Sequence, residues 1–242
     1  MTTTMEPESA NPNYQEAIQS TGRSGDALNV VEELFGNLDK WRHFPSYQLE
    51  RRADIFFSVY LKGFLEREYK RKVLEIIPEF PLHRGTLGKN IAVNKSYKID
   101  YVVRFESCNE IRFVELKTDN SSVRKDQVRY LEDAVKMGLP KLLKGIEQLC
   151  GKTEAKGKYA HLQVCLKTAF HDSSENDIET LYDVKIVYLL PREPDAETMG
   201  VLKEHEIFYF SDFANYVAQF ADPISQRFAQ SLREWSTRLP GD

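Results

Sequence analysis

The chain alternates between stretches whose apolar residues recur every three or four positions and shorter stretches whose apolar residues recur every second position. The first period is typical of a helix with one buried face, and the second of a half-buried strand. Helices are predicted over 26–41, 52–71, about 123–137, 140–150, 211–220 and 222–238. Strands are predicted over Val73–Phe80, Tyr97–Phe105, Ile111–Lys117, 159–169, 184–190 and the short segment Glu206–Phe210.

The order of these elements predicts an α/β fold. Three strands joined by hairpins, then helices and further strands, indicate an α-β-β-β-α-β core in which helices flank a mixed central sheet. Residues 1–25 carry few apolar side chains and are expected to be a disordered tail. Residues 26–242 are expected to form one domain, with its core at about 52–190 and a helical extension at about 206–238.

Composition excludes several classes of protein. Of the 242 residues, 41% are hydrophobic and 29% charged, and no apolar run approaches the length of a membrane-spanning helix. The N-terminus has neither the basic start nor the apolar stretch of a secretory signal. The three cysteines form no CxxC pair, which points to a reducing compartment and a cytoplasmic location.

The net charge of −4 is unevenly distributed. Residues 60–160 hold 21 Lys and Arg against 14 Asp and Glu, whereas the rest of the chain holds 12 against 23. A basic middle between acidic ends is compatible with a surface that faces phosphate. Solvated helix faces with uneven charge are an equally common explanation of this pattern.

Charged residues interrupt two of the predicted strands. Asp100 lies within an apolar run, and Glu115 and Lys117 stand two residues apart in the next strand. Because residues two apart on a strand project from the same face, Glu115 and Lys117 point the same way. The hairpin turn predicted over 106–110 brings Asp100 beside them. Two carboxylates on neighbouring strands suit Mg²⁺ or Mn²⁺, since Mg²⁺ takes oxygen ligands and retains several waters.

An ammonium beside such a metal site can orient or deprotonate a water and offset charge in a phosphorane-like transition state. The set therefore indicates metal-assisted hydrolysis of a phosphodiester. An isolated E-x-K is more commonly a cross-strand ion pair on a solvent-facing sheet. The order of elements favours hydrolysis here. The combination found here is much rarer. It consists of a helix with an inward glutamate, three strands with Asp in the second and E-x-K in the third, and then another helix.

This combination resembles the PD-(D/E)XK nuclease superfamily, which has the restriction-endonuclease-like fold, over about residues 52–170. Asp100 would be the aspartate of its second motif, with Ile99 in place of the usual proline. Fourteen residues separate Asp100 from Glu115. The resemblance implies a Mg²⁺- or Mn²⁺-dependent nuclease that acts on DNA rather than RNA, in repair, restriction or defence. Asp100, Glu115 and the main-chain carbonyl of Leu116 would bind the metal, and Lys117 would act on the water.

The family often adds a glutamate from the first helix and a glutamine or basic residue from the helix after the third strand. Glu68 falls inside the apolar arc of the second predicted helix, whereas Glu66 falls outside it and Asp54 is a more remote alternative. Gln127 matches the second position. Tyr130 follows at a spacing one residue shorter than the Q-x-x-x-Y of exonuclease-like members, so it is equally well a core residue.

Glu79, at the end of the first predicted strand, either lies near the metal or pairs with Arg84 or Lys98. Four basic residues near these elements are candidates for binding phosphate, and each is about as well explained as a solvated side chain: Arg84, Lys98, Arg124 and Lys125. The expected partner is nucleic acid, with a homodimer or a larger nuclease or defence complex compatible with the fold. No membrane partner is expected.

Two other functions remain open at this point. The same fold can serve as a catalytically silent module that binds nucleic acid or a protein, although such modules commonly lose one of the residues that stand here as Asp100, Glu115 and Lys117. A structural or regulatory protein would carry 113–117 as an ordinary edge-strand ion pair. The separation of the Asp100 and Glu115 carboxylates distinguishes this last case, because a metal ion must reach both.

Overall fold

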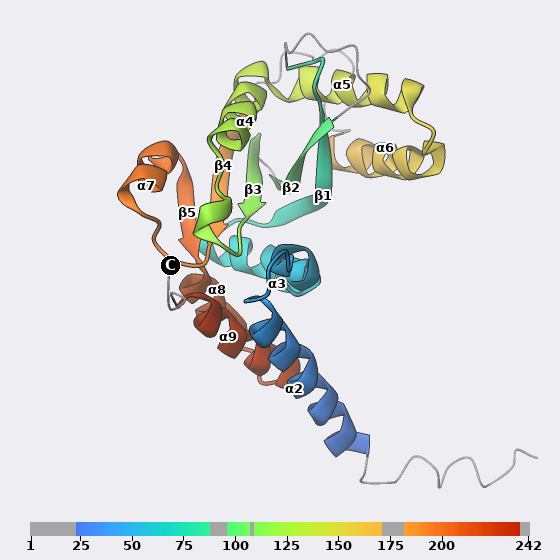
Figure 1. The fold of residues 1–242 in the computed structure, drawn as a ribbon. Coiled ribbons are helices and arrows are strands. Elements are labelled where there is room, and N and C mark those ends of the chain that lie inside the picture. The colour runs from blue at the N-terminus through green and yellow to red at the C-terminus, as the bar shows by residue number, and fades with distance from the viewer. Residues whose placement is uncertain (1–22, 88–95, 107–108, 171–181, 238–242) are drawn as a thin grey trace, which may run out of the picture.

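The protein forms a mixed α/β fold around a five-stranded sheet in order β1-β2-β3-β4-β5 (Figure 1). A computed structural model describes residues 23–87, 96–106, 109–170 and 182–237. Strands β1 and β3 each pair antiparallel with β2, and β4 and β5 run parallel to β3. The strands are β1 (Val73–His83), β2 (Ser96–Phe105), β3 (Glu110–Leu116), β4 (Asp183–Leu190) and β5 (Glu206–Tyr209).

Helices cover both faces of this sheet (Figure 1). One hydrophobic cluster joins the sheet to α2 (Arg23–Trp41), α3 (Leu49–Tyr69), α8 (Phe210–Val217) and α9 (Pro223–Trp235). A second cluster joins the opposite face to α4 (Lys125–Met137), α5 (Leu139–Lys152), α6 (Lys156–Phe170) and α7 (Ala196–Leu202). The helices α4 to α6 form the crossover that parallel strands require between β3 and β4. The predicted mixed sheet flanked by helices is confirmed.

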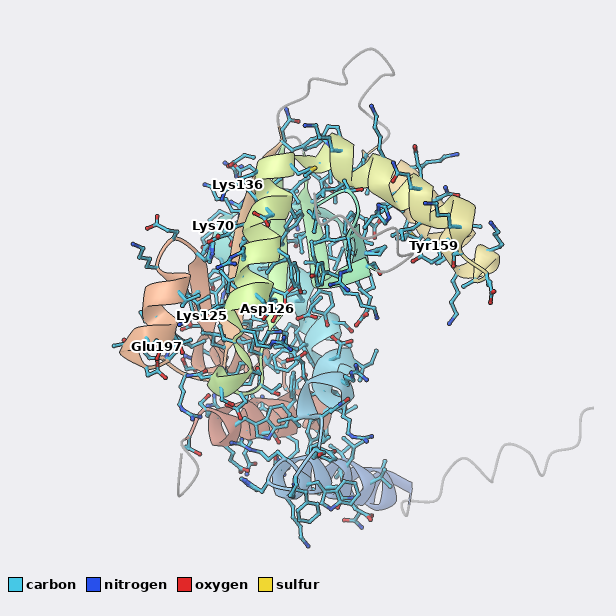
Figure 2. The ribbon with its side chains drawn as sticks, turned by 45° about the horizontal axis from the view of Figure 1, so that its top comes forward. Lys70, Lys125, Asp126, Lys136, Tyr159 and Glu197 are labelled. Carbon is cyan, nitrogen blue, oxygen red and sulfur yellow. The ribbon has the colours of Figure 1, made fainter. Side chains whose placement is uncertain are left out.

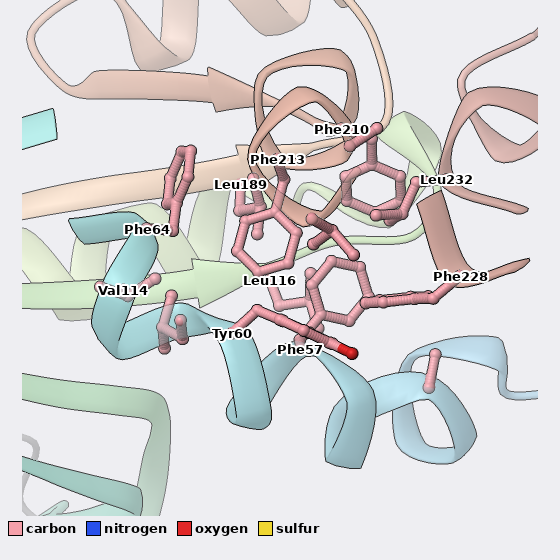
Figure 3. Packing of buried hydrophobic residues seen from close by; sticks show 14 of the residues in the cluster. Phe57, Tyr60, Phe64, Val114, Leu116, Leu189, Phe210, Phe213, Phe228 and Leu232 are labelled. Carbon is pink, nitrogen blue, oxygen red and sulfur yellow. The ribbon is translucent and has the colours of Figure 1, made fainter. Parts of the chain in front are cut away.

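Aromatic side chains fix α3 against the C-terminal helices (Figure 3). Phe57 is 1% exposed, and its ring centroid lies 5.2 to 5.3 Å from those of Phe210, Phe213 and Phe228. Such tilted and edge-on pairs stabilise a core beyond the area that they bury. The predicted C-terminal helices therefore hold α3 in place on the sheet.

The strand predicted over 159–169 is wrong, because these residues belong to α6. Their alternating apolar residues match a strand, but the buried side chains follow helical spacing: Leu166 and Phe170 are buried while Val164 is 61% exposed. Helix α7 was not predicted. Most other elements agree with prediction to within a few residues, and α3 begins at Leu49 rather than at 52.

Of the predicted tail, residues 1–22 lie outside the described residues, and Arg23 already begins α2. Part of the predicted hairpin turn, 107–108, lies outside them as well. The edge strand β1 contains Pro78 and Pro81, and between them Glu79 has a φ of 51°, in the left-handed region. Proline fits an edge strand, where a missing N–H need not break a ladder.

Candidate active site

The charged strand residues lie on one row across the sheet. Pro78 pairs with Tyr101 and Phe80 with Ile99, so Glu79 stands opposite Asp100. Tyr101 pairs in turn with Val114, which places Asp100 opposite Glu115 one position further along.

On the other side, Glu115 pairs with Tyr188 of β4. Neighbouring residues of one row share a face of the sheet. The register thus aligns Glu79, Asp100, Glu115 and Tyr188 across four strands, under the N-terminal half of α4.

The ammonium of Lys117 lies among three carboxylates. Lys117 Nζ is 3.2 Å from Glu115 Oε2, 3.7 Å from Asp100 Oδ2 and 3.8 Å from Glu50 Oε2. It also donates to the main-chain carbonyl of Leu116 at 3.0 Å. The Leu116 N–H in turn donates to Asp100 Oδ2 at 2.8 Å, which ties the end of β3 to β2. The predicted proximity of Asp100, Glu115 and Lys117 is therefore present in the structure.

Helix α4 contributes two side chains to this place. Gln127 Nε2 donates to Glu115 Oε2, and Tyr130 donates to the main-chain carbonyl of Lys98 at 3.2 Å. Gln127 and Tyr130 are three residues apart and so lie on one side of the helix. Together they line an open hollow of about 400 Å³ with Glu50, Arg51, Glu79, Lys98, Asp100, Lys117 and Ser122.

The acidic residue that α3 brings to the hollow is Glu50, which was not predicted. One turn later on the same helix, Asp54 accepts a hydrogen bond from the buried hydroxyl of Tyr101 and so ties α3 to β2. The Glu50–Asp54 spacing of four residues, which puts two acids on one helix face, was a usable signal. It was missed because the helix was predicted to begin at 52.

Glu68 and Glu66 lie elsewhere, and the prediction for Glu68 is corrected on this ground. Glu68 is eighteen positions from Glu50, or about 27 Å along the helix axis, and pairs with Arg67. Glu66 accepts from the Val73 N–H at 3.0 Å and pairs with Lys72. The angular position of Glu68 around the helix, at about 100° per residue, matches that of Glu50. That angle gives no information about position along the helix axis.

Burial and crowding of like charge set the electrostatics of the hollow. Burial raises the pKa of Glu50, of Asp100 and, to about 8, of Glu115. Burial on its own lowers the pKa of Lys117, but the three carboxylates outweigh it, and the pKa of Lys117 is raised overall. Lys117 is therefore an ammonium at neutral pH, and the raised pKa values of the three acids indicate that it does not fully stabilise their ionised forms. The site favours an additional cation.

Two polar atoms of the row have no hydrogen-bond partner. The Glu115 side chain is completely buried, and its Oε1 atom is unpartnered; the hydroxyl of Tyr188, also buried, is unpartnered too. An unsatisfied buried polar group costs about 1–3 kcal/mol. A ligand or water that contacts Glu115 Oε1 would remove this cost.

The oxygen atoms at this site match the ligand preferences of a divalent cation. Within the described part of the chain, no three His, Cys, Asp or Glu side chains are gathered closely enough to enclose a metal by themselves. Mg²⁺ retains several waters and needs only one or two carboxylates. Asp100, Glu115 with its unpartnered oxygen, and the Leu116 carbonyl provide that set, so the residues fit Mg²⁺ or Mn²⁺.

Glu79 both lines the hollow and pairs with Lys98, so the two alternatives that the sequence left open are present together. Arg84 donates to the Tyr97 hydroxyl at 3.0 Å. Arg84 does not line the hollow itself, but Tyr97 stacks on Tyr130, which does.

Arg124 and Lys125 do not line the hollow. Arg124 pairs with Asp126 at 2.8 Å, and Lys125 pairs with Glu197 of α7 at 2.8 Å (Figure 2). All four side chains are largely exposed, so these pairs are weak and open to exchange with phosphate.

No helix among the described residues has the length and apolar character needed to cross a membrane. Comparisons with known protein families, curated proteins and solved structures find no match.

Proposed function

We propose that this protein is a metal-dependent nuclease of the PD-(D/E)XK type, hydrolysing phosphodiester bonds of DNA in preference to RNA, with a cytoplasmic role in repair, restriction or defence. The observation that carries the proposal is the convergence of Asp100, Glu115 and Lys117: Asp100 and Lys117 line one hollow, and Glu115, buried in contact with Lys117, has an unpartnered oxygen. A plain cross-strand ion pair explains it less well, because Lys117 and Glu115 are buried rather than solvent-facing.

In this proposal, Asp100, Glu115 and the Leu116 carbonyl would hold Mg²⁺ or Mn²⁺, which when bound would supply Lewis-acid polarisation and a more acidic water. Lys117 acts as a cation, since its raised pKa keeps it protonated. It donates a hydrogen bond to the attacking water and offsets negative charge that develops on the phosphate. Gln127 orients the Glu115 carboxyl by a hydrogen bond to Oε2, and Glu50 of α3 pairs with the Lys117 ammonium.

The test compares Asp100→Asn and Lys117→Ala with two exposed control variants on α4, Asp126→Asn and Lys136→Ala. Each is incubated with linear duplex, circular and single-stranded DNA and with RNA, in Mg²⁺, Mn²⁺ or EDTA. We expect metal-dependent cleavage by the wild type and both controls, and none by the two site variants. Lys117→Ala should remain folded and still bind Mn²⁺. Cleavage by Asp100→Asn at the wild-type rate contradicts the proposal.

A catalytically silent binding module is the other outcome of this test. It is supported if the folded wild type binds nucleic acid yet cleaves none of these substrates with any metal.

A further inference from the structure

One face of α5 is made of lysines. At 100° per residue, Lys141, Lys144 and Lys152 fall within an arc of about 80°, and all three are exposed. Gln148 is the other long side chain on this arc, and Glu147, the acidic residue of α5, lies outside it. The lysine face of α5, defined by these three lysines, is thus a band of positive charge to which α5 itself contributes no acidic residue.

Gly145 sets α5 close against the turn that follows β1. A Cβ at this position would lie 2.5 Å from Thr86 Oγ1 and 3.2 Å from His83 Cβ, so a larger residue would push the helix away. Lys152 is near enough to His83 that its charge, after burial, lowers the pKa of that imidazole. The lysine face of α5 therefore borders the turn that carries Arg84.

A series of stacked side chains leads from this turn to the hollow. The Arg84 guanidinium lies 4.5 Å from the centroid of the Tyr97 ring. Tyr97 stacks on Tyr130 with centroids 4.2 Å apart and an interplanar angle of 9°, and Tyr130 lines the hollow beside Lys98. Packed side chains therefore connect the hollow to Arg84, and Arg84 lies on the turn that α5 borders.

We propose that the lysine face of α5, together with Arg84, holds the phosphate backbone of a nucleic acid whose scissile phosphate lies in the hollow. This inference rests on the proposed nuclease function and adds the path of the substrate. Lys141 and Lys152 are eleven positions apart, or about 17 Å along the helix. At about 3.4 Å per nucleotide this spans about five phosphates of one strand.

Binding to this surface is independent of sequence. Lysine is a flexible point charge that contacts phosphate rather than reading base edges. Such contacts release condensed counterions, so each lowers the slope of log K against log salt concentration by about 0.9 on duplex DNA.

The test neutralises the lysine face of α5 in a triple variant, Lys141→Gln, Lys144→Gln and Lys152→Gln. The matched control is a second triple variant, Lys136→Gln, Lys185→Gln and Lys203→Gln, in lysines that line a separate hollow together with Glu132, Glu204 and Glu206. Binding of labelled duplex DNA, single-stranded DNA and RNA is measured by fluorescence anisotropy in EDTA, over a range of salt. Far-UV circular dichroism and thermal melting establish that both variants fold.

We expect the slope for duplex DNA to become shallower by about 2 to 3 in the α5 variant and to stay unchanged in the control. Loss of binding confined to single-stranded DNA or RNA would also support the surface and would identify the nucleic acid that it holds. An unchanged slope on all three ligands, or an equal change in the control, overturns the inference. If the wild type binds through α5 but cleaves no substrate, only the proposed nuclease function is contradicted. If the wild type and the α5 variant bind and cleave equally well, only the proposed role of the lysine face of α5 is contradicted.

Discussion

Replacing Glu115 with glutamine should make the metal-free protein more stable at pH 8. The buried carboxyl of Glu115 has its pKa raised from 4.5 to about 8, chiefly by burial and next by the charge of Asp100. The unfolded chain loses this proton near pH 4.5, whereas the folded protein keeps it until about pH 8. Stability therefore falls as pH rises through this window, and glutamine, which has no charge to bury, removes the loss.

The magnitude follows from the same displacement. Each pKa unit corresponds to about 1.4 kcal/mol, so the move from 4.5 to about 8 sets an upper bound of about 5 kcal/mol. Glutamine also removes one of the three carboxylates around Lys117, which offsets part of the gain. We expect a net gain of about 2 kcal/mol, on the order of half this bound. For a chain of this size, that raises Tm by about 4–8 °C.

The assay is thermal unfolding of wild type and Glu115→Gln from pH 4.5 to 8.5, in EDTA and in Mg²⁺. The difference in Tm should vanish at the acid end and grow toward pH 8. Mg²⁺ should stabilise the wild type but not the variant. A variant less stable than wild type at pH 8, or a difference that does not change with pH, would refute the reasoning.

Three further substitutions test other parts of the structure. With metal bound, the unpartnered Tyr188 hydroxyl would serve as an outer-shell hydrogen-bond partner, so Tyr188→Phe should weaken Mn²⁺ binding about tenfold by calorimetry. Tyr60→Phe, whose hydroxyl contacts Ser225 on α9, should leave Mn²⁺ binding unchanged. Phe57→Ala should cost about 3–5 kcal/mol in chemical denaturation because it empties the aromatic cluster; a cost below about 1 kcal/mol would contradict that packing. Asp39→Ala deprives both Arg227 and Trp235 of an acceptor and should cost about 3 kcal/mol by the same measurement, with Asp39→Asn retaining part of it.

The strand pattern in the sequence predicted both structure and chemistry, because the two-residue period that indicates a strand also indicates which charged side chains share a face. The alternation of polar and apolar residues in Ile111–Lys117 put Glu115 and Lys117 on one face and, with the predicted hairpin, brought Asp100 to them. These interactions are local in the sheet, so sequence spacing was enough to predict them.

Long-range packing decided what the sequence analysis missed. Residues 159–169 alternate like a strand, but the second hydrophobic cluster buries Leu166 and Phe170 on one side of a helix. Glu50 lies at the hollow because of where α3 begins and how Phe57 packs against α8 and α9. Residues more than 150 positions away determine that placement, so the Glu50–Asp54 spacing indicates an acidic face of the helix but not that this face meets the hollow.

The two edges of the sheet also bear on how copies of the chain can meet. Strand β1 has two residues without an N–H donor, Pro78 and Pro81, and a left-handed backbone at Glu79, while β5 is only four residues long. An intermolecular sheet needs a long, regular row of free donors and acceptors, which neither edge offers. Growth of the sheet from chain to chain is thus disfavoured, and pairing of two copies would have to use helical surfaces such as the exposed side chains of Leu34 and Ile55.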